Sequence, residues 1–240
     1  MGMSLLMGSA AAAQPMTKEQ GDIVIKELRE IRQLLAKQAT QAPAQAPAPA
    51  AAAPTAKQLT LKEDGVYALG RDDATLTLVE FTDYQCPFCS QFEANTLPEL
   101  KKNYIDTGKL RIVLRDLPLE FHQFALGAAQ AARCAGDQGH FWEMKTLLFK
   151  NQTALDLDSL ATYAGSLSLD IPSFKTCISS GKHLQKVRDD ASYARSLNIT
   201  GTPSFVLGRK NGDSLTGTLI VGAQPLAYFD NAIKDALQHP

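Results

Sequence analysis

The stretch Phe81-Thr82-Asp83-Tyr84-Gln85-Cys86-Pro87-Phe88-Cys89 holds two cysteines three positions apart, between an apolar run and a helical pattern. Residues 76–81 are rich in branched and aromatic side chains, which is typical of a buried strand. Pro87 suits the first position of a helix, because its φ is already fixed and its missing N–H is not needed there. The sequence therefore predicts that Cys86 lies at the N-terminus of a helix.

This predicted position has a chemical consequence for the two thiols. Unpaired backbone N–H groups and the positive end of the helix dipole favour a thiolate, so the pKa of Cys86 is expected to be low. Cys89 lies one turn later on the same face, where it can attack a mixed disulfide formed by Cys86. The pattern indicates redox chemistry, with Cys86 as nucleophile and Cys89 as resolving cysteine.

Other uses of a C-x-x-C pair fit the sequence less well. Zinc needs about four ligands, usually as two close pairs, and Cys134, Cys177 and the 4 histidines supply no second pair in the sequence. Haem attachment requires a histidine after the second cysteine, where Ser90 stands. A purely structural disulfide across so short a loop removes little entropy from the unfolded chain. We therefore expect neither a metal nor a cofactor at this motif.

Composition and the remaining cysteines restrict the class of protein. The 240 residues are 45% apolar and carry a formal net charge of −1, which argues against general nucleic-acid binding. Cys134 and Cys177 are each flanked by residues of a predicted helix core, so we expect a structural disulfide that closes a loop of about 44 residues. Such a disulfide favours an oxidising compartment, whereas spare thiols in a cytosolic thioredoxin-like protein remain the alternative.

Three segments precede the predicted globular domain. Residues 1–13 resemble the end of a signal peptide, with a short apolar core and small residues but no basic start. Residues 14–39 contain a predicted amphipathic helix over 17–38, and its roughly two heptads are marginal for a free-standing coiled coil. Residues 40–57 form a linker rich in alanine and proline. We expect a partner chain to cover the helix; packing on its own domain or on a membrane surface remains open.

The rest of the chain, 58–240, predicts an α/β fold. The expected strands lie at 66–69, 76–81, 110–115, 204–207 and 219–221. The expected helices follow Cys86, with an interruption at Pro98, and occupy 124–135, 141–150, 157–166, 172–180, 184–197 and 226–237. The helices between about 121 and 198 form an inserted helical subdomain, and the other elements form a mixed sheet with helices on its faces.

Glu80 lies inside the predicted buried strand, six positions before Cys86. A buried carboxylate is costly unless it is hydrogen-bonded or used in proton transfer. The sequence is compatible both with a proton-handling role and with a side chain that points to solvent at a sheet edge.

Three motifs occur in a fixed order: Phe81 to Cys89, Ala132 to Met144, and Gly201-Thr202-Pro203 before a strand. Together they resemble the DsbA-like disulfide oxidoreductases, which have a thioredoxin fold with a helical insertion. The resemblance covers about residues 58–240. It implies that Glu80 corresponds to the buried acid near the cysteine pair of that family.

The resemblance also implies roles for the residues around the pair. Cys86 attacks and carries the mixed disulfide, and Cys89 resolves it. The Thr202–Pro203 bond is expected to be cis and to face the active site, where Thr202 offers its backbone to an extended substrate. We also assign Phe88 to substrate binding.

These observations lead to one main hypothesis: a periplasmic or otherwise extracytoplasmic dithiol oxidase that acts on cysteine-containing secreted proteins. A membrane redox partner is expected to re-oxidise or reduce it. The N-terminal helix and linker look more like oligomeric relatives, including ScsC-type proteins. An oligomeric isomerase or reductase, assembled through residues 17–38, is therefore the alternative. A non-catalytic thioredoxin-fold chaperone that binds peptides beside Pro203 and a cytosolic thiol-dependent transferase are further alternatives.

Overall fold

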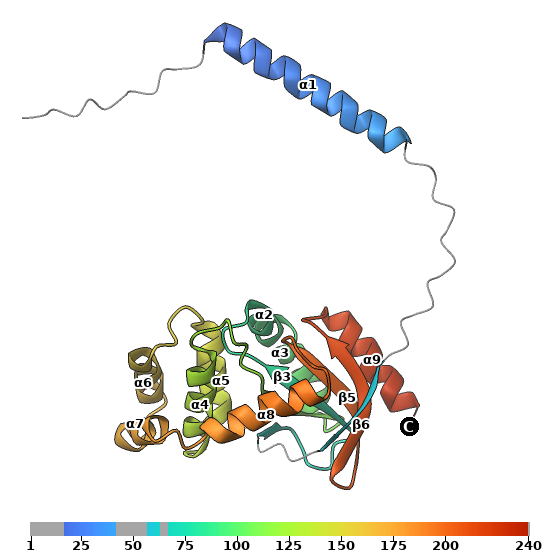
Figure 1. The fold of residues 1–240 in the computed structure, drawn as a ribbon. Coiled ribbons are helices and arrows are strands. Elements are labelled where there is room, and N and C mark those ends of the chain that lie inside the picture. Colours follow the sequence, from blue (N-terminus) through green and yellow to red (C-terminus); the bar gives the residue numbers. More distant parts are fainter. Residues whose placement is uncertain (1–16, 42–56, 63–66, 240) are drawn as a thin grey trace, which may run out of the picture. The chain divides into compact units, whose positions relative to one another are not determined.

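The computed structural model describes residues 17–41, 57–62 and 67–239 (Figure 1). The chain divides into two units, residues 1–54 and 55–240. The signal-like segment 1–13 and most of the linker predicted at 40–57 lie outside the described residues. Among the described helices, none combines the length and the apolar content needed to cross a bilayer.

The first unit contains one helix, α1 (Lys18–Gln41), which extends beyond the predicted span 17–38. Thr17 and Gln20 begin it with a capping box, because the backbone N–H of each donates to the side chain of the other. The large apolar side chains described in α1 are 45–63% exposed: Ile23, Val24, Ile25, Leu28, Ile31 and Leu34. Within the first unit, the described residues therefore leave this apolar stripe exposed.

A six-stranded mixed sheet forms the centre of the second unit, in the order β1-β6-β5-β3-β4-β2. The central strand β3 (Leu76–Thr82) pairs parallel with β4 (Leu110–Asp116) and antiparallel with β5 (Ser204–Asn211). The sheet continues through β6 (Ser214–Val221) to β1 (Gln58–Lys62) on one side, and ends at β2 (Ala68–Leu69) on the other. All seven residues of β3 are buried, as expected for a strand covered on both faces.

Several helices cover one face of this sheet around a cluster of aromatic rings. Phe92 of α2 (Pro87–Asn95) packs against Phe205 of β5 and Phe229 of α9 (Leu226–Gln238). Helix α2 ends at Thr96 and is followed by the short α3 (Leu97–Leu100) and a π-helical turn at Lys101–Ile105. The predicted interruption at Pro98 is confirmed, because proline stands in the first turn of α3, where it needs no N–H partner.

The helical insertion lies between β4 and β5 and is built as predicted, to within one or two residues at each end. Its helices are α4 (Ala125–Gly136), α5 (Phe141–Lys150), α6 (Leu157–Ser166), α7 (Ile171–Ser179) and α8 (Leu184–Ser196). Asp156 and Asp170 cap α6 and α7 by accepting backbone N–H groups of the first turn. The predicted Cys134–Cys177 disulfide is present and joins α4 to α7.

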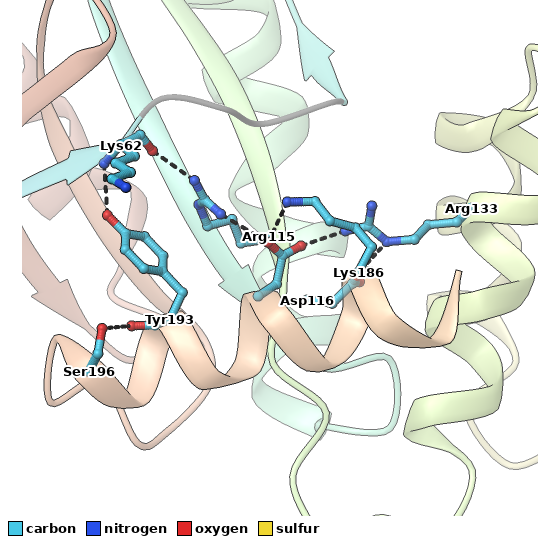
Figure 2. A network of polar contacts seen from close by, with 8 residues as sticks. Lys62, Arg115, Asp116, Arg133, Lys186, Tyr193 and Ser196 are labelled. Carbon is cyan, nitrogen blue, oxygen red and sulfur yellow. Dashed lines mark hydrogen bonds and ion pairs between the residues drawn. The ribbon is translucent and has the colours of Figure 1, made fainter. Parts of the chain in front are cut away.

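Buried ion pairs fasten this insertion to the sheet (Figure 2). Arg133 of α4 contacts Asp116 at the end of β4 at 2.6 Å and Asp190 of α8 at 2.5 Å. Arg115 of β4 contacts Asp190 at 2.9 Å. All four side chains are almost fully buried, so loss of any one upsets the balance of charge in a dry site. The network therefore joins α4 and α8 to the C-terminal end of β4, beside the end of β3 that leads into the C-x-x-C turn.

Candidate active site

The turn between β3 and α2 places Cys86 directly before Pro87, at the N-cap of α2, as predicted. The buried carboxylate of Asp83 holds this turn. It accepts the backbone N–H groups of Gln85 and Leu119, each at 2.7 Å, and lies 2.8 Å from Nδ1 of His122. The backbone N–H of Cys86 donates to the carbonyl of Asp83 at 3.1 Å. One acidic side chain thus fixes the approach to the helix and links it to the start of the insertion.

The two thiols differ strongly in acidity, and they are not bonded to each other in this structure. A hydrogen bond from Cys89 lowers the pKa of Cys86 from its ordinary value of 9.0 to about 5. Burial opposes this shift, while the Thr202 side chain and the backbone N–H groups of Cys89 and Phe88 add to it. Burial raises the pKa of Cys89 far above its ordinary value, and the neighbouring Cys86 raises it further. Cys86 is therefore the thiolate of the pair and Cys89 the thiol.

A loop from much later in the sequence, just before β5, completes the site. The Thr202–Pro203 bond is cis, as the family resemblance implied, and β5 begins at the next residue. The carbonyl oxygen of Thr202 lies 3.3 Å from Sγ of Cys86 and accepts a hydrogen bond from the thiol when Cys86 is protonated. Residues 116 positions apart in the sequence are thereby in direct contact at the nucleophile.

A buried charge cluster lies on β3 and the helices that cover it. Glu80 is fully buried, so a solvent-facing side chain at a sheet edge is excluded. Nζ of Lys145 on α5, also fully buried, lies 3.5 Å from Oε2 of Glu80 and contacts the carboxylate of Glu93 on α2. Burial raises the pKa of Glu80, the charge of Lys145 opposes the rise, and Glu93 adds to it. Burial lowers the pKa of Lys145, but the two carboxylates outweigh it and hold the net pKa above its ordinary value.

Thr82 connects this cluster with the thiols. It follows Glu80 by two positions on β3, so both side chains point to the same face of the sheet. The Thr82 side chain opposes the effect of burial on both neighbours, since it lowers the pKa of Glu80 and of Cys89. Glu80 and Cys89 therefore share a buried hydroxyl neighbour.

The sequence analysis did not identify two residues that contribute to the site. Lys145 lies on the buried face of α5, together with Met144 and Leu148. A lysine among the apolar residues of a helix is the sequence signal that could have identified it. Gln152 follows α5 in a loop, and its side-chain amide donates to the carbonyls of Tyr84 and Cys86, both at 2.9 Å. No spacing or pattern in the sequence predicts these two hydrogen bonds.

The predicted site residues fall into two places. Cys86, Cys89, Thr202 and Pro203 come together at the N-terminus of α2, with Glu80 buried on the preceding strand, and Phe88 is 60% exposed between the two cysteines. The Cys134–Cys177 disulfide belongs to the insertion, where His183 lies beside it.

A family model described as Thioredoxin matches residues 62–218. The Na(+)/H(+) antiporter NhaA 1 of Salinispora arenicola is 37% identical over 173 residues, which are 71% of this chain. The chain spans only 26% of the length of that antiporter. The probable disulfide bond formation protein D of Bacillus anthracis is 33% identical over 146 residues, which are 57% of this chain and 67% of that protein.

Solved structures of similar fold include proteins of the same kind. The crystal structure of Wolbachia pipientis α-DsbA1 is similar with a TM-score of 0.65 and 29% identity, over 71% of this chain and 90% of that chain. The catalytic domain of Proteus mirabilis ScsC is similar with a TM-score of 0.58 and 26% identity, over 71% of this chain and 88% of that chain. Both solved chains are thus matched over most of their length.

Proposed function

Because the chain belongs to the DsbA-like thiol:disulfide oxidoreductases of the thioredoxin fold, we propose that it is a dithiol oxidase of cysteine-containing secreted proteins. The observation that carries this proposal is the pKa of Cys86, lowered to about 5 beside the raised pKa of Cys89. A stable thiolate favours the reduced form of the pair, so its disulfide is readily reduced and acts as an oxidant.

The proposed cycle has two exchange steps. A substrate thiolate attacks Sγ of Cys86 in the Cys86–Cys89 disulfide, and Cys89 leaves as a thiolate that takes up a proton. A second substrate thiolate then attacks the substrate sulfur of the mixed disulfide, and Cys86 leaves as a thiolate. Two electrons pass to the enzyme and one substrate disulfide forms. A membrane redox partner accepts these electrons and restores the active-site disulfide.

The surrounding residues have separate tasks in this cycle. Glu80, whose pKa is raised by burial, delivers and removes the proton of Cys89, and Lys145 balances the charge. Thr202 and the cis Pro203 present backbone to an extended substrate segment, which adds to the site as a strand does. Phe88 supplies exposed apolar surface beside the sulfur of Cys86.

A single substitution separates this proposal from a peptide-binding chaperone without redox chemistry. The oxidised protein is mixed with a reduced two-cysteine peptide, and the loss of free thiol is measured for the natural chain and for Cys86→Ser. The proposal expects rapid oxidation by the natural chain and none by the variant. Equal thiol oxidation by the two proteins would show that Cys86 is not the reacting group.

Helix α1 favours a second candidate function, an oligomeric isomerase. Its apolar side chains from Ile23 to Leu34 are exposed, and apolar stripes of this kind are covered by a partner. The reduced full-length protein is compared with a form that lacks residues 1–57 on a substrate with scrambled disulfides. Recovery of the substrate by the full-length form alone would establish an isomerase assembled by α1. Equal behaviour of both forms would leave α1 as a tether.

The proposed place of action is outside the cytoplasm. The signal-like segment 1–13 lies outside the described residues, and the Cys134–Cys177 disulfide supports an oxidising compartment. Fractionation of bacteria that express the full-length chain tests this, with disappearance of residues 1–13 from the extracytoplasmic form as the expected result. Retention of the intact chain in the cytoplasm, with Cys134 and Cys177 reduced, would contradict it.

A further inference from the structure

A second group of reactive side chains lies in the insertion, apart from the active-site pair. The sulfurs of Cys134 and Cys177 and a ring nitrogen of His183 all lie within 4.8 Å of one another. Oδ2 of Asp137 lies 2.9 Å from Nε2 of His183 and 3.5 Å from Sγ of Cys177. Two sulfurs, an imidazole and a carboxylate thus converge from the end of α4, from α7 and from the start of α8.

The spacing of these atoms suits a tetrahedral cation. Zinc binds thiolate sulfur at about 2.3 Å and imidazole nitrogen at about 2.0 Å, so atoms around one ion lie roughly 3–4 Å apart. The disulfide now bonds the two sulfurs directly, and its cleavage lets them separate to that range. Sulfur and imidazole ligands together select Zn²⁺ and similar ions over Mg²⁺ or Ca²⁺.

We propose that reduction of the Cys134–Cys177 disulfide creates a binding site for Zn²⁺ or a similar thiophilic cation. Cys134, Cys177 and His183 are the protein ligands, and Asp137 or water takes the fourth position. A dithiol reductant supplies two electrons and two protons, becomes a disulfide itself and leaves two thiols. The cation then replaces the two thiol protons, which pass to the solvent.

The surface around the disulfide allows this exchange. A cavity of about 640 Å³ opens beside it, lined among others by Cys134, Asp137, Cys177 and Lys182, so a reductant and an ion can enter. The ammonium of Lys182 lies 2.9 Å from Oδ2 of Asp137, where it balances the carboxylate in the disulfide form. Its side chain is 58% exposed and can move into solvent when a metal cation takes over that charge.

The exchange has a consequence for the fold. The disulfide connects α4 to α7, and His183 adds the N-cap position of α8. A bound cation would hold these elements together by coordination after the disulfide is cut, since metal binding to the folded state stabilises that state. The insertion would then stay assembled under both oxidising and reducing conditions.

The test uses the full-length chain with Cys86→Ser and Cys89→Ser, so that the active-site thiols bind no metal. The protein is reduced with a phosphine, freed of reductant and titrated with Co²⁺ as a spectroscopic probe. One equivalent of Co²⁺, with thiolate-to-cobalt charge-transfer absorption and tetrahedral d–d bands, is the expected result. Absence of these bands after reduction, or the same bands in the oxidised protein, would overturn the proposal.

A pair of histidine variants tests whether the cation binds at the proposed site of the folded insertion. His183→Ala should weaken Co²⁺ binding by about tenfold or more. His239→Ala is the matched control, because His239 is 73% exposed near the C-terminus and interacts with Asp235, four positions earlier. Zn²⁺ should also raise the unfolding temperature of the reduced His239→Ala protein and not that of His183→Ala. Equal binding by both variants would mean that two loose thiols bind the ion without the proposed site.

Discussion

Cys86 and Cys89 stand three positions apart, yet their thiols hold their protons very differently. The hydrogen bond from Cys89 is the largest cause of the lowered pKa of Cys86. The alkylation rate of Cys86 in the reduced protein should therefore rise with pH and reach half its maximum near pH 5. Cys89→Ala should move this midpoint upward, and Cys89→Ser, which keeps a donor, should move it less. An unchanged midpoint in Cys89→Ala would contradict the assigned cause.

The same thiolate makes the stability of the reduced protein depend on pH. The pKa of Cys86 is lower in the folded protein than its ordinary value of 9.0, which the unfolded chain has. Its stabilising effect is thus complete above pH 9 and is lost as the pH falls through about 5. Urea unfolding of the reduced protein from pH 9 to pH 5 should show a larger loss of stability than Cys86→Ser shows. Parallel pH profiles of the two proteins would argue against a low pKa.

Lys145 is the cation between two buried carboxylates, and its loss should be costly. Lys145→Met leaves Glu80 and Glu93 without a partner, so the free energy of unfolding should fall by about 3–5 kcal/mol. Lys150→Met is the control, since Lys150 ends the same helix in an exposed position. Chemical denaturation measures both variants. Equal and small losses would show that the protein does not depend on this charge cluster.

At the scale of elements, the contact between β5 and β6 depends on two glycines. Gly208 and Gly217 stand opposite each other in the register, and a Cβ on Gly208 would lie 2.1 Å from the carbonyl oxygen of Thr216. Gly208→Ala should therefore cost about 1–3 kcal/mol, because the strands must separate. Gly127→Ala on α4 meets no atom within 4 Å and should be neutral or gain up to about 1 kcal/mol. Thermal unfolding that ranks the two variants in the opposite order would contradict this packing.

Local patterns were sufficient for most elements of the sheet and the insertion. The helices from Ala125 to Ser196 show clear periodicity, two of them begin at an aspartate cap, and they lie where the sequence predicted them. Strand β1 (Gln58–Lys62) was missed, because it is a short edge strand with one buried residue. Strands β5 and β6 are longer than predicted. The added end of β5 is polar and largely exposed, and the added part of β6 alternates polar residues and glycine with one buried apolar residue, Leu215. These ends are strands because β5 and β6 pair with each other there, which an apolar pattern does not reveal.

At the scale of the whole molecule, the site combines parts that the chain keeps far apart. The C-x-x-C motif and its helix position were predictable, because they depend on neighbours in sequence. The place of Thr202 and Pro203 at the active site came from the family resemblance, as did the cis bond before Pro203, whereas the contact of Thr202 with Cys86 came from the structure. Lys145 and Gln152 had to come from the structure, because their partners lie 52–68 positions away. The Arg133–Asp190 pair, 57 positions apart, was hidden for the same reason.

The equilibrium reduction potential of the Cys86–Cys89 pair tests the central claim most directly. The reduced fraction of the full-length protein is measured in glutathione buffers of known ratio. With the pKa of Cys86 lowered to about 5, the thiolate stabilises the reduced pair, and the disulfide should be strongly oxidising. The account predicts a potential above about −180 mV and nearer to about −120 mV. A value near the −270 mV or so of thioredoxin would indicate a reductant and contradict the proposed oxidase.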